Sequence, residues 1–152
     1  MIKLNLKDIL EYQQNRPPYL MIDCAEKIVP GKSSLGYKYF KDDEWFFKVH
    51  WKNDPNVPGM LQIEALTQMA SLSILTLDGN KGKVMYLANA NKLKFLKKIT
   101  PNSKFVIETS VISYKRGLAK FSASGKINND LACSAEFTLI MPEELMKYNL
   151  KK

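Results

Sequence analysis

The chain has little of the residue types that most often bind metals or act as reactive thiols: one histidine and two cysteines in 152 residues. Cys24 and Cys133 lie far apart, form no Cys-x-x-Cys pair and have no second histidine to accompany them. A metal site is therefore not expected. Two reduced structural thiols are the default for such a pattern.

Long uncharged apolar segments are also lacking. A membrane-spanning helix needs roughly 20 consecutive apolar residues, and the most apolar segment here is interrupted by Gln62, Glu64 and Gln68. Residues 1–8 carry charges throughout and lack the apolar part of a signal peptide. Because there is also no repeat or low-complexity segment, the sequence predicts one cytoplasmic domain over residues 1–152, with no membrane span.

Acidic residues are in the minority. The chain has 23 Lys and Arg against 15 Asp and Glu, a net charge of +8, and many of the basic residues fall in its second half. A solvated face of a sheet explains such a distribution, and so does a surface that attracts an acidic partner. No nucleic-acid-binding motif accompanies the basic residues, so nucleic acid is not the expected partner.

The hydrophobic pattern predicts a sheet and one buried helix. A short helix is expected at 6–14, ended by Pro17 and Pro18, and an extended aromatic run at 45–50. From Gly59 to about residue 77 apolar residues recur on nearly every side, which is typical of a buried helix. Alternation in the second half indicates an antiparallel sheet with one wet face, and therefore an α+β architecture. The expected strands cover 19–28, 34–40, 83–95, 104–114, 118–127 and 131–141.

The candidate catalytic residues lie around the start of the buried helix. Glu64 and Gln68 are spaced i, i+4, so they share one helix face, and no Lys or Arg between residues 52 and 81 can pair with Glu64. A carboxyl group desolvated without a cation favours its neutral form, the state that a general acid needs. Taken alone, Glu64 is explained equally well as a solvated helix residue as by a catalytic role. His50 taken alone is likewise explained equally well as a structural residue. Together with the amides at Gly59, they supply an acid, a base and oxyanion donors.

These residues form a motif that resembles a known family. The motif is His50-Trp51-x-x-x-Pro55-x-x-Pro58-Gly59-x-x-x-x-Glu64-Ala65-x-x-Gln68. It is similar to the H-F-P-G-N-P-x-M-P-G-x-x-x-x-E-A-x-x-Q signature of the hot-dog-fold 3-hydroxyacyl-[acyl carrier protein] dehydratases, with the same spacing from the histidine to the glutamate. The resemblance covers residues 16–139, beginning at an R-P-P-Y-L-M-I-D segment that is similar to the family's R-Y-P-F-L-L-V-D.

Three positions depart from the family pattern. Lys52 and Asn53 replace its first Pro-Gly, Asp54 replaces the next asparagine, and Asn15 stands where a histidine commonly precedes the R-Y-P-F-L segment. Because asparagine tolerates a left-handed backbone, we expect the turn to survive at Asn53. The mouth of the site gains a charge pair.

The resemblance implies a hot-dog fold, an antiparallel sheet wrapped around one long central helix, and a lyase of fatty acid biosynthesis. His50 would take the C2 proton of a 3-hydroxyacyl thioester and Glu64 would protonate the leaving hydroxyl, giving the trans-2-enoyl thioester. The Gly59 amide would meet the negative charge on the thioester oxygen. The Asn56 carbonyl would orient His50, and Gln68 would orient Glu64. Neither a metal nor an organic cofactor is implied.

The resemblance also implies partners. Acyl carrier protein would deliver the substrate to a basic docking surface, defined as Lys92, Lys94, Lys97 and Lys98. Two chains would share their active sites in a homodimer, and assembly into a trimer of dimers stays open. Two alternatives remain: a hot-dog acyl thioesterase and a catalytically silent acyl-binding homologue. Acyl chain length, pathway, isomerisation of the enoyl product and the effect of the altered turn are not determined by the sequence.

Overall fold

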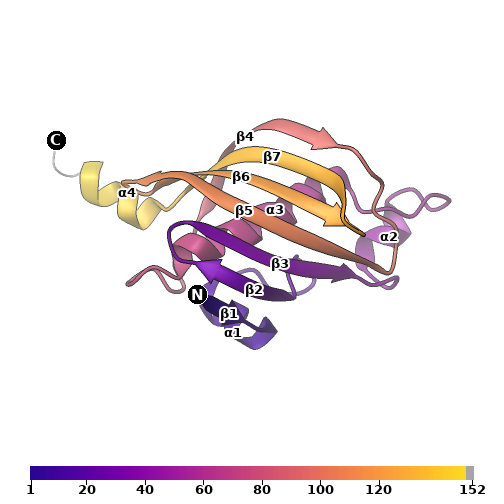
Figure 1. Cartoon of the computed structure of the whole chain (residues 1–152), viewed down its shortest axis with the longest axis horizontal. Helices are drawn as coiled ribbons and strands as arrows, with labels where there is room; N and C mark the ends of the chain where they lie inside the picture. The colour runs from indigo at the N-terminus through magenta and orange to yellow at the C-terminus, as the bar shows by residue number, and fades with distance from the viewer. Residues whose placement is uncertain (150–152) are drawn as a thin grey trace.

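The computed structural model describes residues 1–149. One antiparallel sheet of seven strands wraps around helix α3 (Gly59–Leu75), which lies behind the sheet in Figure 1. This is the predicted α+β hot-dog fold. In spatial order the strands are β1 (Ile2–Leu4), β2 (Cys24–Val29), β3 (Ser33–Phe40), β5 (Ser103–Lys115), β6 (Leu118–Ile127), β7 (Asp130–Ile140) and β4 (Tyr86–Phe95).

The core forms between α3 and the concave face of the sheet. Burial alternates along β6 and β7, so that Phe121 and Phe137 point inward and pack with ring centroids 5.6 Å apart. Helix α3 is buried along almost its whole length, as its unbroken apolar pattern predicts. None of the helices among residues 1–149 is long and apolar enough to cross a membrane.

The extended aromatic run expected at 45–50 is wrong: residues Trp45–Val49 form helix α2. Phe46 and Phe47 are neighbours in sequence and both are buried. Neighbouring side chains on a strand point to opposite faces, whereas a helical turn places both rings against the same core. Phe46 also packs edge-on against Phe40, with ring centroids 5.9 Å apart.

Other boundaries also differ from the expectation. Strand β2 starts at Cys24 instead of residue 19, because the amide of buried Met21 donates to a side chain of α3 and not to a neighbouring strand. Helix α1 (Leu6–Tyr12) begins with a capping box between Asn5 and Asp8 and stops two residues before its predicted end. Strand β1 and helix α4 (Pro142–Asn149) were not predicted.

Strand β4 forms one outer edge of the sheet, next to β7 (Figure 1). Nine of its ten residues are exposed, and they include the large apolar side chains of Tyr86, Leu87, Leu93 and Phe95. A long, apolar, unpaired edge is a template for pairing with another strand. This edge lies beside both of the cavities described next.

Candidate active site

His50 is held in a defined orientation at the C-terminal end of α2. Its Nδ1 atom lies 3.0 Å from the backbone oxygen of Asn56. A carbonyl only accepts hydrogen bonds, so Nδ1 carries the proton and Nε2 keeps its free lone pair. Asn56 is itself fixed, because its side-chain amide donates to the Asp54 carbonyl at 2.7 Å. The geometry therefore presents Nε2 as a base.

The turn after His50 is closed differently from the sequence expectation. Its left-handed residue is Trp51, with φ of 54°, and not Asn53. In this conformation the Trp51 ring stacks on the His50 ring, with centroids 4.7 Å apart. The charge introduced at Asp54 pairs with Lys98 at 2.7 Å, which ties the turn to the segment after β4. The stacking of Trp51 was not predicted.

His50 lines a cavity of about 410 Å³ that also contains the start of α3. Gly59 is the first residue of that helix, and its N-cap, Pro58, provides no side-chain cap. The first amides of α3 therefore lack intrahelical acceptors, and the helix dipole adds positive potential there. A Cβ at Gly59 would come within 3.0 Å of the Phe95 ring, so a larger residue here would require that ring to shift. These amides can stabilise an oxyanion.

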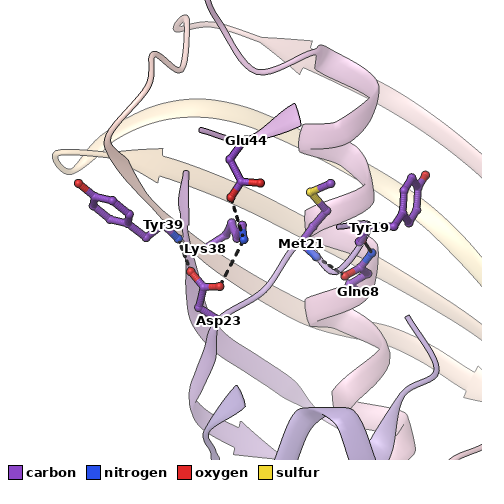
Figure 2. A network of polar contacts seen from close by, with 7 residues as sticks. All are labelled: Tyr19, Met21, Asp23, Lys38, Tyr39, Glu44 and Gln68. Carbon is purple, nitrogen blue, oxygen red and sulfur yellow. Dashed lines mark hydrogen bonds and ion pairs between the residues drawn. The ribbon is translucent and has the colours of Figure 1, made fainter. Parts of the chain in front are cut away.

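Glu64 is oriented by Gln68, one turn further along α3. The Gln68 amide nitrogen donates to Glu64 Oε1 at 2.8 Å. The same nitrogen donates to the Tyr19 carbonyl at 3.0 Å, while the Gln68 oxygen accepts from the Met21 amide at 2.7 Å (Figure 2). Gln68 is buried and Glu64 half-buried. Burial and the neighbouring Glu64 carboxylate raise the pKa of the Tyr19 phenol, so the Tyr19 hydroxyl near Glu64 keeps its proton.

A second polar network, missed by the sequence reasoning, joins the same loop to α2. Lys38 is buried and pairs with Asp23 at 3.3 Å and with Glu44 at 3.2 Å (Figure 2). Glu44 is the N-cap residue of α2, whose C-cap is His50. Asp23 is the last residue of the loop whose backbone forms hydrogen bonds with the Gln68 side chain. One signal was available: Lys38 falls on the inward-facing alternation of β3, where a lysine needs a carboxylate partner.

Among the residues that the structure describes, the two candidate catalytic residues line different cavities. Glu64 lines a separate cavity of about 150 Å³ together with Thr67, Gln68 and residues of β4, whereas His50 lines the cavity at the start of α3. Residues 1–149 contain no group of three or more His, Cys, Asp or Glu side chains placed to hold a metal ion. The roles assigned to His50 and Glu64 stay predictions.

The basic docking surface is partly neutralised. Lys97 pairs with Asp130 at 2.9 Å and Lys92 with Glu136 at 3.5 Å, in addition to the pair between Lys98 and Asp54. Such exposed ion pairs are worth only about 0–1 kcal/mol and can be exchanged for other partners. Lys97 and Lys98 also line the His50 cavity, so this surface and that cavity are adjacent.

Comparisons with known proteins identify the family of this chain. Residues 14–136 match the FabA-like domain family. The 3-hydroxyacyl-[acyl-carrier-protein] dehydratase FabZ of Clostridium novyi (strain NT) is 35% identical over 138 residues, covering 90% of this chain and 97% of that protein. The FabZ dehydratase of Clostridium tetani (strain Massachusetts / E88) is 36% identical over 141 residues, covering 93% and 99%.

Solved structures with the same fold are more distant in sequence. The dehydratase heterocomplex ApeI:P from Xenorhabdus doucetiae matches with a TM-score of 0.74 at 11% identity, covering 92% of this chain and 95% of that one. A hypothetical thioesterase with coenzyme A from Streptococcus pneumoniae TIGR4 matches with a TM-score of 0.58 at 13% identity, covering 76% and 82%. At such identities the likeness concerns the fold alone.

Proposed function

Because the chain belongs to the FabA-like domain family, we propose that it dehydrates 3-hydroxyacyl thioesters carried on acyl carrier protein, with His50 as base and Glu64 as acid. The dehydratase activity follows from relatives that align over nearly their whole length. The observation that carries the residue roles is the hydrogen bond from His50 Nδ1 to the Asn56 carbonyl, which leaves Nε2 free beside the first amides of α3.

The reaction needs two proton transfers and no redox step. The thioester carbonyl makes the C2 proton acidic, and His50 Nε2 removes it while negative charge grows on the thioester oxygen. The Gly59 amide donates to that oxygen and stabilises the charge. The electron pair from C2 then forms the C2–C3 double bond, and the 3-hydroxyl leaves as water with a proton from Glu64. Gln68 holds the Glu64 carboxyl in place during this step.

The active sites are shared between two chains in our proposal. Within one chain His50 and Glu64 line different cavities, and β4, with its exposed edge, lies between them. A two-fold dimer that pairs β4 with the partner's β4 would cover the apolar edge and bring the His50 cavity of one chain to the Glu64 cavity of the other. Such an isologous contact uses the same surface on both chains.

The basic docking surface is the proposed landing site for the carrier. It adjoins the His50 cavity, and its lysines would exchange their present carboxylate partners for those of an acidic carrier. We also place the protein in the cytoplasm, because both cysteines are free thiols and Cys133 is fully buried.

A direct test supplies 3-hydroxyacyl carrier-protein thioesters of varied chain length and follows their mass. Loss of one water with the thioester intact supports the dehydratase, whereas release of free thiol would identify a thioesterase. No reaction with any chain length, from protein with native circular dichroism, would favour a silent acyl-binding protein. His50→Ala protein serves as the control for uncatalysed loss of water.

A further inference from the structure

His50 and Trp51 are neighbours in the chain, and their side-chain rings lie face to face. The ring centroids are 4.7 Å apart and the ring planes differ by 23°, which is a stacked pair. Neighbouring side chains point in different directions in a helix and to opposite faces in a strand, so neither regular structure places them face to face. The left-handed backbone of Trp51, with φ of 54°, brings its indole onto the imidazole. The contact therefore depends on an unusual local conformation.

Tryptophan is an unexpected residue for that conformation. Trp51 follows His50, the C-cap of α2, and glycine or asparagine is the usual left-handed residue after a helix. A bulky side chain is strained there. Asn53, which would tolerate the conformation, lies only two residues further on, yet the turn places Trp51 in it. Because strained residues cluster at functional sites, the conformation of Trp51 calls for a functional explanation.

Burial does not explain the strained conformation. Trp51 is 65% exposed where it lines the same cavity as His50, so its indole gains little from the hydrophobic effect. The other tryptophan differs in this respect. Trp45, the first residue of α2, packs edge-on against the buried Phe46 ring, with centroids 5.5 Å apart. Trp45 therefore has a packing role, whereas Trp51 stacks on the imidazole.

The stack can act on His50 in two ways. The hydrogen bond from Nδ1 to the Asn56 carbonyl fixes one atom of the imidazole but leaves the ring plane able to tilt, because hydrogen bonds tolerate a range of angles. An indole face against the imidazole restricts this tilt and so fixes the direction of the Nε2 lone pair. The electron-rich face also attracts a cation within about 6 Å, and a protonated imidazole is a cation.

We propose that Trp51 is a positioning residue for the base: it fixes the plane of the His50 ring and stabilises the imidazolium formed when Nε2 takes the C2 proton. The inference rests on the proposed dehydratase function and deepens it. The proton moves from C2 to Nε2, while Nδ1 keeps its own proton and its bond to the Asn56 carbonyl. The ring then carries a positive charge against the indole face. Because this charge is absent before the reaction, the contact lowers the barrier more than it strengthens substrate binding.

The experiment compares replacements of Trp51 that separate the ring from the backbone conformation. Trp51→Phe keeps an aromatic face, Trp51→Leu keeps apolar bulk without one, and Trp51→Asn removes the ring but suits the left-handed backbone. Trp45→Leu is the matched control, because it replaces a tryptophan of α2 that is 43% exposed and does not stack on His50. Each protein is assayed with 3-hydroxyacyl carrier-protein thioesters, and its melting temperature is measured at one protein concentration.

Trp51→Leu and Trp51→Asn should lower kcat by about 3- to 30-fold, the effect of losing one cation–π contact with the imidazolium, with KM little changed. Trp51→Phe should retain most of the activity, and Trp45→Leu should have a kcat close to that of wild type. Trp51→Asn should also melt at or above the wild-type temperature, because it relieves the strained backbone. A merely structural role would give the opposite result, a lower melting temperature with an unchanged kcat.

Proton NMR detects the stack itself, independently of turnover. His50 is the single histidine of the chain, so its ring C–H protons give signals with no counterpart from another imidazole. Protons that face an aromatic ring are shielded and move upfield. The His50 signals should therefore move downfield in Trp51→Leu and Trp51→Asn, and they should stay in place in Trp45→Leu.

Unchanged His50 signals in Trp51→Leu would show that the rings do not stack and would overturn the proposal. So would a wild-type kcat in folded Trp51→Leu and Trp51→Asn, even if the signals move. A raised KM with an unchanged kcat would overturn it too, by assigning Trp51 to a contact with substrate or carrier. Failure of wild-type protein to dehydrate any thioester would contradict the proposed function, and this inference with it, even where the NMR signals verify the stack.

Discussion

Gln68 is the side chain that connects Glu64 to the rest of the fold, and Gln68→Leu removes this connection while keeping a similar side-chain volume. Three hydrogen bonds are lost: those to the Met21 amide at 2.7 Å, to the Tyr19 carbonyl at 3.0 Å and to Glu64 at 2.8 Å. Met21 is fully buried, so its amide would be left without a partner in the core.

The stability cost follows from these contacts. An orphaned buried amide costs about 1–3 kcal/mol, and the two partly buried bonds add about 0.5–1.5 kcal/mol each, for a total of roughly 2–6 kcal/mol. In a domain of this size 1 kcal/mol shifts Tm by about 2–4 °C, so Tm should fall by roughly 4–24 °C. Protein concentration must be held constant, because the dimerisation that we propose would make Tm depend on it.

The turnover of Gln68→Leu measures the orientation of Glu64, independently of the loss of stability. A carboxyl that loses its orienting partner should lower kcat by about 10- to 100-fold, with KM little changed, in protein that is still folded at the assay temperature. Ser73→Ala is a matched control, since the buried Ser73 hydroxyl donates only to the Ala70 carbonyl of its own helix. Gln68→Leu protein with a wild-type kcat and a wild-type Tm would refute the account of how Glu64 is held.

Three further predictions concern the acid and base, the docking surface and the buried thiol. His50→Ala and Glu64→Gln should each lower kcat by about 10²–10⁴-fold with a near-normal Tm, and near-normal dehydration by either folded variant would reject its role. Replacing Lys94 and Lys97 together by Glu should raise KM for carrier-linked substrate and flatten its salt dependence but leave a small thioester analogue unaffected; equal effects on both would reject docking. Burial raises the pKa of Cys133 to about 12, above its unfolded value, so the stability it contributes is complete below the unfolded pKa and is lost as pH rises towards 12. Cys133→Ala should flatten this alkaline loss in urea melts, and an unchanged alkaline slope would contradict it.

The parts of the fold that could be predicted are those governed by local periodicity. The all-round apolar pattern predicted α3, and alternation predicted β6 almost to the residue. Helix α2 was not predicted, because its aromatic residues suit a helix as well as a strand. Only packing against Phe40 in the assembled core decides between the two. The loop before Cys24 looked like a strand because it is apolar, although its Met21 amide is taken by Gln68, 47 residues away.

The contacts of the candidate site could be predicted where the motif fixes the spacing of two residues. They could not be predicted where they join residues far apart in the chain. The motif located His50, Glu64 and Gln68, and the hydrogen bond from Gln68 to Glu64 follows from their i, i+4 spacing. The inward-facing position of Lys38 on β3 indicates that it needs a carboxylate partner, but Asp23 and Glu44 lie up to 21 positions apart, so no local pattern identifies them as its partners. In our proposal His50 and Glu64 meet between two chains, and a single sequence does not describe such a contact.

The shared active site is the central claim, and complementation between two inactive variants tests it most directly. His50→Ala and Glu64→Gln chains are co-expressed, and native mass spectrometry verifies that mixed dimers form. With sites shared between chains, each mixed dimer has one site with both defects and one intact site. Random assembly makes about half of the dimers mixed, so activity should return to about a quarter of wild type, far above either variant alone. Mixed dimers that are present but no more active than the two variants would place both residues in one chain and contradict the account.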